Sequence, residues 1–98
     1  MHIQVNTGHN IESRGGLATY VSSTVESALT VLSDQITRVE VHLSDENSGK
    51  GGPNDKRCMM EARLEGRQPI AVTHEASTVD EAVGGAADKL ARLAGNTP

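Results

Sequence analysis

Cys58, the single cysteine of the chain, and the histidines His42 and His74 are the side chains that most readily suggest catalysis. A thiol beside an imidazole can act as a nucleophile with its general base. Cys58, however, alternates with Met60 and Leu64 on one side of a predicted strand, and a cysteine on such an apolar face is usually a small buried hydrophobe. His42 falls on the opposite face of its own strand, and no acid is placed to orient either histidine. We therefore expect no enzyme, and a small hydrolase is the weakest hypothesis.

A glycine-rich segment at 45–55 resembles two kinds of ligand-binding loop but matches neither. Residues 49–52 lack the Walker spacing, and no serine or threonine follows Lys50, as a phosphate-binding loop requires. As a calcium loop that begins at Asp45, the segment has Lys50 where glycine is needed and Lys56 where glutamate is needed. Two interpretations of this segment remain: a flexible loop that becomes ordered against RNA, and plain disorder. We also expect no metal or cofactor, because His2, His9 and His74 are not spaced in the sequence as the ligands of a metal site are.

Two arginines predicted on the outer face of a sheet, Arg38 and Arg63, are candidates for phosphate contacts. Cationic side chains neutralise phosphates and release counterions, and the guanidinium forms forked hydrogen bonds to phosphate oxygens. Cross-strand ion pairs of these arginines with Glu40 and Glu61 are an equally good explanation. The two explanations stay open at this point.

The composition describes one small domain without an overall attraction for nucleic acid. The chain has 98 residues, nine of them basic and thirteen acidic, and its net charge of −4 means that phosphate binding needs a local basic patch. A single cysteine suits a reducing compartment. There is no signal-peptide pattern, and no apolar run approaches the roughly 20 residues that cross a bilayer. We expect a cytoplasmic protein with one domain over 1–98, a flexible loop at about 45–55, a short tail at 95–98 and no membrane partner.

The segment Thr37–Glu65 organises the fold and is predicted to form a long β-hairpin. Apolar and polar residues alternate in both arms, which is typical of strands with one buried and one solvated face. The predicted inward residues are Val39, Val41, Leu43, Cys58, Met60, Ala62 and Leu64. The same alternation predicts a short strand around 3–5 and a fourth strand around 70–74.

Two amphipathic helices flank these strands. Apolar residues at three- and four-residue spacing predict a first helix over 17–32, with Ser13 as its N-cap. A serine–threonine pair at 77–78 with acidic residues at 80–81 predicts a capping box at the start of the second helix. Two glycines at 84–85 either permit a close contact or weaken that helix. The resulting order is β-α-β-β-β-α, an α+β fold whose four-stranded mixed sheet carries both helices on one face.

With these elements in place, the chain resembles the ribosome hibernation factor family of ribosome-associated inhibitors and hibernation-promoting proteins, formerly called sigma-54 modulation proteins. Residues 3–12 (IQVNTGHNIE) look like the first strand of that family and its Thr-Gly-His turn. Residues 79–83 (VDEAV) and 87–93 (ADKLARL) are similar to its final helix with an Asp-Lys-Leu-x-Arg pattern. The loop residues 49–52 (GKGG) and 55–58 (DKRC) look like a short proteobacterial branch of the family.

The resemblance implies a translation regulator that binds the small ribosomal subunit, with its 16S-type rRNA, near the decoding channel. There it would overlap the mRNA and tRNA positions and hold idle ribosomes inactive. The match to the final helix assigns RNA contacts to Lys89 and Arg92, and the likeness to the short branch adds Lys56 and Arg57. The complete set of predicted RNA-binding residues is therefore Lys56, Arg57, Lys89, Arg92, Arg38 and Arg63. We expect no small-molecule substrate and a monomer off the ribosome.

An alternative is a protein-interaction module of the same fold without ribosome binding. The acidic balance of the chain favours it, and so does the predicted first helix, which contains no lysine or arginine. A steep salt dependence of ribosome binding would separate the two functions.

Overall fold

The computed structural model describes residues 1–8, 11, 15–45 and 55–95 of the chain. Within these residues, four strands and two α-helices follow one another in the order β-α-β-β-β-α. The strands are β1 (His2–Thr7), β2 (Ile36–Asp45), β3 (Lys56–Leu64) and β4 (Ile70–Ala76). The helices are α1 (Leu17–Ala28), a short 3-10 helix η1 (Thr30–Leu32) and α2 (Val79–Gly95). The element order and the α+β class predicted from the sequence are confirmed.

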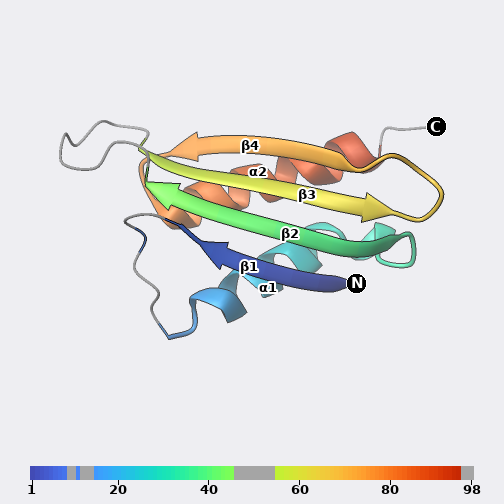
Figure 1. The fold of residues 1–98 in the computed structure, drawn as a ribbon, viewed down its shortest axis with the longest axis horizontal. Helices are drawn as coiled ribbons and strands as arrows, with labels where there is room; N and C mark the ends of the chain where they lie inside the picture. The colour runs from blue at the N-terminus through green and yellow to red at the C-terminus, as the bar shows by residue number, and fades with distance from the viewer. Residues whose placement is uncertain (9–10, 12–14, 46–54, 96–98) are drawn as a thin grey trace.

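The strands form one mixed sheet in the order β1-β2-β3-β4 (Figure 1). β1 runs parallel to β2, with Ile3 opposite Val39, because α1 carries the chain back to the other end of the sheet before β2 begins. β2 with β3 and β3 with β4 are antiparallel pairs, so the long predicted hairpin is confirmed. Its predicted loop falls mainly on 46–54, outside the described residues.

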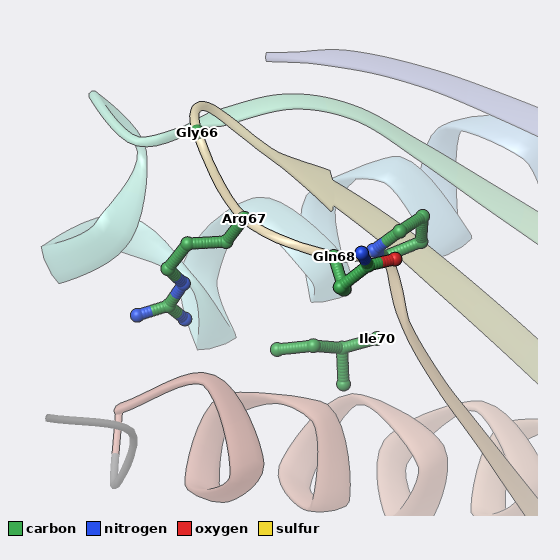
Figure 2. Close-up of a pocket in the computed structure, with 5 residues that line it drawn as sticks. Gly66, Arg67, Gln68 and Ile70 are labelled. Atoms are coloured by element: carbon green, nitrogen blue, oxygen red, sulfur yellow. The ribbon is translucent and has the colours of Figure 1, made fainter.

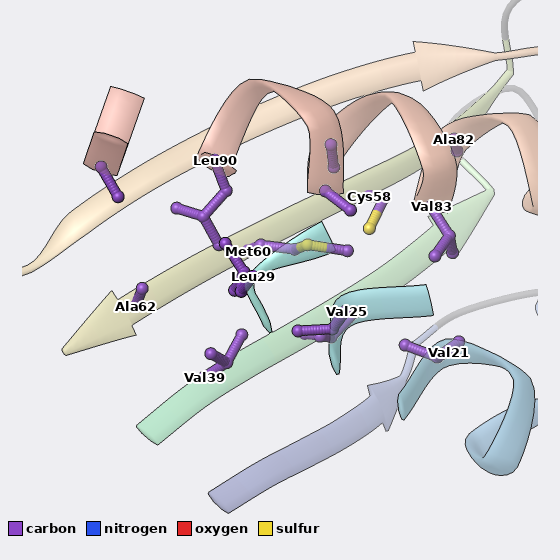
Figure 3. Close-up of a cluster of buried hydrophobic side chains, with 14 of the residues drawn as sticks. Val21, Val25, Leu29, Val39, Cys58, Met60, Ala62, Ala82, Val83 and Leu90 are labelled. Atoms are coloured by element: carbon purple, nitrogen blue, oxygen red, sulfur yellow. The ribbon is translucent and has the colours of Figure 1, made fainter. Parts of the chain in front are cut away.

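Both helices cover the same face of the sheet (Figure 1), and the core lies between them and the strands. Figure 3 shows Val21 and Val25 of α1, and Leu29 just after α1, in one buried cluster with inward side chains of β2 and β3. Leu90 and Val83 of α2 close the core from the side of β3 and β4. The inward residues predicted for the hairpin are all buried: Val39, Val41, Leu43, Cys58, Met60, Ala62 and Leu64. The opposite face of the sheet carries polar side chains.

The first helix is shorter than the sequence predicts. α1 ends at Ala28, and Leu29 leaves the helical region at φ −108° and ψ 16° before η1 begins. Serine, threonine and valine fill much of this helix and have modest helix propensity, so little intrinsic preference opposes the early end of α1, and Leu29 is buried just beyond it. Gly16, with a φ of 91°, occupies the N-cap position. The predicted N-cap, Ser13, lies outside the described residues.

The second helix begins with the capping box that the sequence predicts. The backbone N–H of Glu81 donates to Oγ1 of Thr78 at 3.1 Å. The Glu81 carboxylate in turn accepts hydrogen bonds from the hydroxyls of Ser77 at 2.9 Å and Thr78 at 3.3 Å. The negative charge of an acidic residue in the first turn is also stabilised by the positive end of the helix dipole. These contacts fix the point at which the chain leaves β4 and begins α2.

The glycine pair in α2 has one member that the packing requires. A Cβ atom on Gly85 would lie 2.1 Å from Cδ2 of His74, whereas a Cβ on Gly84 would meet nothing within 4 Å. His74 extends from the helix-facing side of β4 and is half-buried. Close contact with the imidazole therefore explains Gly85, and no packing contact explains Gly84.

We expect alanine at these two positions to change the stability in opposite directions. Gly84→Ala should raise the free energy of unfolding by about 0.5–1 kcal/mol, because alanine is the better helix former and the added methyl has room. Gly85→Ala should lower it by about 1–3 kcal/mol, because the His74 ring must move. Urea unfolding measures both, and His74→Ala in the Gly85→Ala background should restore most of the loss. Equal effects of the two alanine substitutions would contradict the packing argument.

Candidate nucleic-acid interface

The solvated face of the sheet has a centre that is close to electrically neutral. The register places Arg38 of β2 opposite Arg63 of β3, and in the next row Glu40 opposite Glu61. Like charges directly opposite repel each other, but here the arginine row is followed by the glutamate row along the strands. This alternation reduces the attraction of the central face for phosphate.

Arg38 already contacts its neighbours on this face. Its Nε donates to Oε2 of Glu40 at 3.1 Å, and a terminal amino group donates to the side-chain oxygen of Gln4. The other oxygen of Glu40 lies 3.5 Å from Nε2 of His42. The guanidinium of Arg63 makes no hydrogen bond or ion pair within the described part of the chain. The ion-pair explanation therefore fits Arg38, and Arg63 is the more available cation of the two.

The two predicted cations at the loop end of the hairpin lie close to carboxylates. Nζ of Lys56 is 3.1 Å from Asp55 and 3.3 Å from Asp45. The hydrogen bond with Asp55 is the largest cause of a raised pKa of Lys56; desolvation opposes the shift, and Asp45 adds to it. Arg57 is exposed on the opposite face of β3, where the register places Glu75 of β4 beside it. Phosphate would have to compete with these acids at this end of the sheet.

Lys89 and Arg92 lie on α2 beside the edge strand β4. Nζ of Lys89 donates to the backbone carbonyl of Thr73 at 2.9 Å. The Arg92 guanidinium lies 2.9 Å from the carboxylate of Asp88, one helical turn earlier. This ion pair is solvent-exposed, and such pairs contribute only about 0.3–0.5 kcal/mol. Arg92 can therefore turn toward a ligand at small energetic cost, whereas Lys89 would exchange its hydrogen bond with the Thr73 carbonyl for one with the ligand.

Arg67 is a further basic residue near the end of α2, and it is not among the predicted RNA-binding residues because the sequence shows only that it lies in a turn. It follows Gly66, which turns the chain from β3 into β4 with a φ of 72°. Its Nη2 donates to the carbonyl of Ala94 at 3.4 Å, near the end of α2 (Figure 2). The helix dipole favours a cation at that end. The sequence signal is a lone arginine between glycine and glutamine, and its proximity to α2 depends on the tertiary fold.

The predicted RNA-binding residues thus separate into two groups. Arg67, Lys89 and Arg92 lie along β4 and α2, whereas Arg63 lies near the β3–β4 turn on the solvated face of the sheet. Of these four, only Arg92 has a carboxylate partner among the described residues, and that pair is exposed. The remaining predicted cations are paired with, or lie opposite, acidic side chains: Arg38, Lys56 and Arg57.

Cys58 has the environment of a core residue. It is fully buried between the sheet and α2, and burial raises the pKa of its thiol to about 12. Since the thiolate is the nucleophilic form, the thiol is unreactive at neutral pH. Across the sheet, Cys58 is paired with His74, whose ring packs on the backbone of α2 at Gly85. This geometry gives no support to a Cys–His catalytic pair.

We expect Cys58 to resist thiol reagents until the domain opens. At pH 8 its thiolate fraction should be about 10³-fold below that of an unfolded cysteine, given the raised pKa of about 12. Labelling with a chromogenic disulfide reagent should therefore be slow in buffer and complete within seconds in denaturant. Fast labelling of the native chain would contradict the buried position.

Two further properties bound the chemistry of the described residues. In residues 1–8, 11, 15–45 and 55–95, no group of three or more histidine, cysteine and acidic side chains could hold a metal ion. None of the helices in these ranges is long and apolar enough to cross a membrane.

Comparison with known proteins gives a family and a fold. The family model described as "Sigma 54 modulation protein / S30EA ribosomal protein" matches residues 4–94. The structure is similar to the N-terminal domain of Protein Y from Thermus thermophilus, with a TM-score of 0.75 and 24% identity over 95% of this chain and 94% of that chain. It is also similar to a ribosomal subunit interface protein from Coxiella burnetii, with a TM-score of 0.77 and 18% identity over 95% and 92% of the two chains. No curated protein matches the sequence significantly.

Proposed function

Because the chain belongs to the family of sigma 54 modulation proteins and S30EA ribosomal proteins, we propose that it binds the small ribosomal subunit near the decoding channel and holds idle ribosomes inactive. The observation that carries this proposal is the family match, which spans residues 4–94 and so nearly the whole chain. The family consists of ribosome-associated factors and is not an enzyme family.

The described residues suit a ligand that is recognised through its backbone and shape. Structured RNA presents phosphates and ribose hydroxyls at its surface, so cations matter more than groups that read bases. Tyr20 is the only phenylalanine, tyrosine or tryptophan of the chain and lies on α1, so the open face of the sheet offers none of these three rings for stacking on bases. Arg63, Lys89 and Arg92 are the first contacts we propose. Further contacts would require Lys56, Arg57 and Arg38 to turn from nearby acids.

Inhibition on this proposal needs no chemical step. A compact domain seated in the decoding channel would occupy the space of mRNA and tRNA, and its removal would restore the ribosome. The net charge of −4 gives no long-range attraction to RNA, so binding depends on short-range contacts that salt weakens. We infer that the rRNA of the small subunit is the principal partner.

Displacement of mRNA and tRNA tests the location. Small subunits carrying a fluorescent mRNA and initiator tRNA are titrated with the purified chain, and the release of both ligands is followed by anisotropy. The proposal predicts release in step with binding of the chain. Saturated binding of the chain to subunits that keep both ligands would place it elsewhere on the ribosome.

A second candidate function is a protein-interaction module without ribosome affinity. α1 contains no lysine or arginine, and a hollow of about 560 Å³ separates it from α2. Tyr20 and Asp88 lie among the small side chains that line this hollow. A chain with this function would show no binding to small subunits even at low salt, and would retain a protein partner from lysate.

A further inference from the structure

The turn between β3 and β4 forms the rim of a hollow with a volume of about 710 Å³. Its lining is a continuous stretch of chain, residues 66–70, and Figure 2 shows Ile70 directed toward α2 beneath it. Gly66 gives the turn its positive φ, and the N–H of Arg67 donates to the carbonyl of Leu64 at 3.3 Å. The wall of the hollow is thus a hydrogen-bonded turn, and the Arg67 side chain links this turn to the end of α2 through the carbonyl of Ala94.

Arg67 brings a positive charge to this hollow that no carboxylate in the described part of the chain neutralises. Its one side-chain hydrogen bond among these residues is to the carbonyl of Ala94, at 3.4 Å. A guanidinium carries five N–H donors, so most of its hydrogen-bonding capacity is unused. The side chain is half-buried, and its contact with the end of α2 limits its freedom. A positioned, largely unsatisfied guanidinium beside a hollow is suited to the forked hydrogen bonds of a phosphate group.

A second hollow follows along the same side of β4. It has a volume of about 360 Å³ and is lined by Val72, Lys89, Arg92 and Leu93. Ile70 of the first hollow and Val72 of the second are alternate residues of one strand and face the same way, so the two hollows are successive. Both place cations beside apolar surface, and Leu93 is 50% exposed between α2 and β4. An RNA strand presents a series of phosphates, so cations at successive hollows along one edge suit its backbone.

We propose that Arg67 and the hollow of residues 66–70 form a phosphate-binding site for the RNA backbone, continuous with Lys89 and Arg92 along β4. This inference rests on the proposed function, because it names the surface that meets the rRNA. The neutral centre of the sheet and the acid-paired cations at the loop end of the hairpin leave this edge as the least neutralised basic surface among the described residues.

The salt dependence of small-subunit binding tests the site. Arg67→Gln should weaken binding roughly 3- to 10-fold at moderate salt and reduce the slope of log K against log salt by about 0.7–0.9, as expected for one lost phosphate contact. Arg67→Lys keeps the charge and should keep the slope. Ser27→Glu is the matched control, because it lowers the net charge by the same amount on the exposed side of α1. It should bind like the wild-type chain.

Two contrary outcomes are distinguishable. If the wild-type chain binds small subunits and Arg67→Gln binds with the same affinity and slope, the Arg67 site is wrong and the proposed function stands. If the wild-type chain fails to bind at any salt, the proposed function is wrong and the site loses its basis. Thermal unfolding of Arg67→Gln accompanies the titration, and a folded variant with the reduced slope supports the site.

Discussion

Replacing Lys89 and Arg92 together with glutamine is expected to lower the affinity for small ribosomal subunits roughly 10- to 100-fold at moderate salt. Both side chains project from α2 beside β4, and the carboxylate contact that Arg92 makes is exposed. Two lost phosphate contacts should reduce the slope of log K against log salt by about 1.4–1.8. Stability should change by less than about 1 kcal/mol, because an exposed ion pair and one edge hydrogen bond are lost. Fluorescence-detected sedimentation measures the affinity.

A charge-matched control is available on α1. Ser23→Glu with Ser27→Glu lowers the net charge by the same two units, and both serines are exposed on the helix that contains no basic residue. This variant should bind almost like the wild-type chain. Equal losses in both double variants would mean that overall charge, rather than the two α2 cations, determines the affinity. Unchanged binding of the Lys89 and Arg92 variant would remove these residues from the interface.

Leu90→Ala is expected to lower the free energy of unfolding by about 2–5 kcal/mol. Leu90 is fully buried on α2 and packs with Leu29 and Met60 at the centre of the core (Figure 3). Removing most of its side chain loses apolar burial and leaves a cavity that the surrounding sheet cannot fill. Urea unfolding followed by circular dichroism measures the change.

Leu93→Ala supplies the control within the same helix. Leu93 is 50% exposed, so the same chemical change should cost less than about 1 kcal/mol. A small effect of Leu90→Ala, or equal effects of the two substitutions, would contradict the packing of α2 on the sheet. Because a small domain has only about 5–15 kcal/mol of total stability, Leu90→Ala should also shift the midpoint of thermal unfolding markedly.

The fold was predictable because apolar and polar residues clearly mark the buried and the solvated faces of its strands. Alternation through the hairpin places Val41 and Met60 inward and Glu40 and Glu61 outward, and the register confirms these faces. The capping box predicted at the start of the second helix is also present. The predicted end of the first helix was wrong. The apolar periodicity of the sequence continues through Leu32, whereas the backbone leaves the α-helical form at Leu29.

The candidate site was less predictable, because it depends on contacts between segments distant in the sequence. The sequence gives no sign that the Lys56 ammonium contacts both Asp45 and Asp55, or that the turn places Arg67 against the carbonyl of Ala94. It also left open whether Gly84 or Gly85 serves a packing contact, which depends on where His74 lies. RNA contacts of Lys89 and Arg92 remain a prediction.

Co-sedimentation of the purified chain with small ribosomal subunits on sucrose gradients, at about 50 and 200 mM salt, measures ribosome binding directly. We expect the chain to travel with the small subunit at the lower salt and to be largely released at the higher, with a slope of log K against log salt of about −2 to −4. A slope in this range corresponds to the small number of cations that the described surface offers. Absence of binding at the lower salt would contradict the proposed ribosome binding and would favour a protein partner at the hollow between α1 and α2.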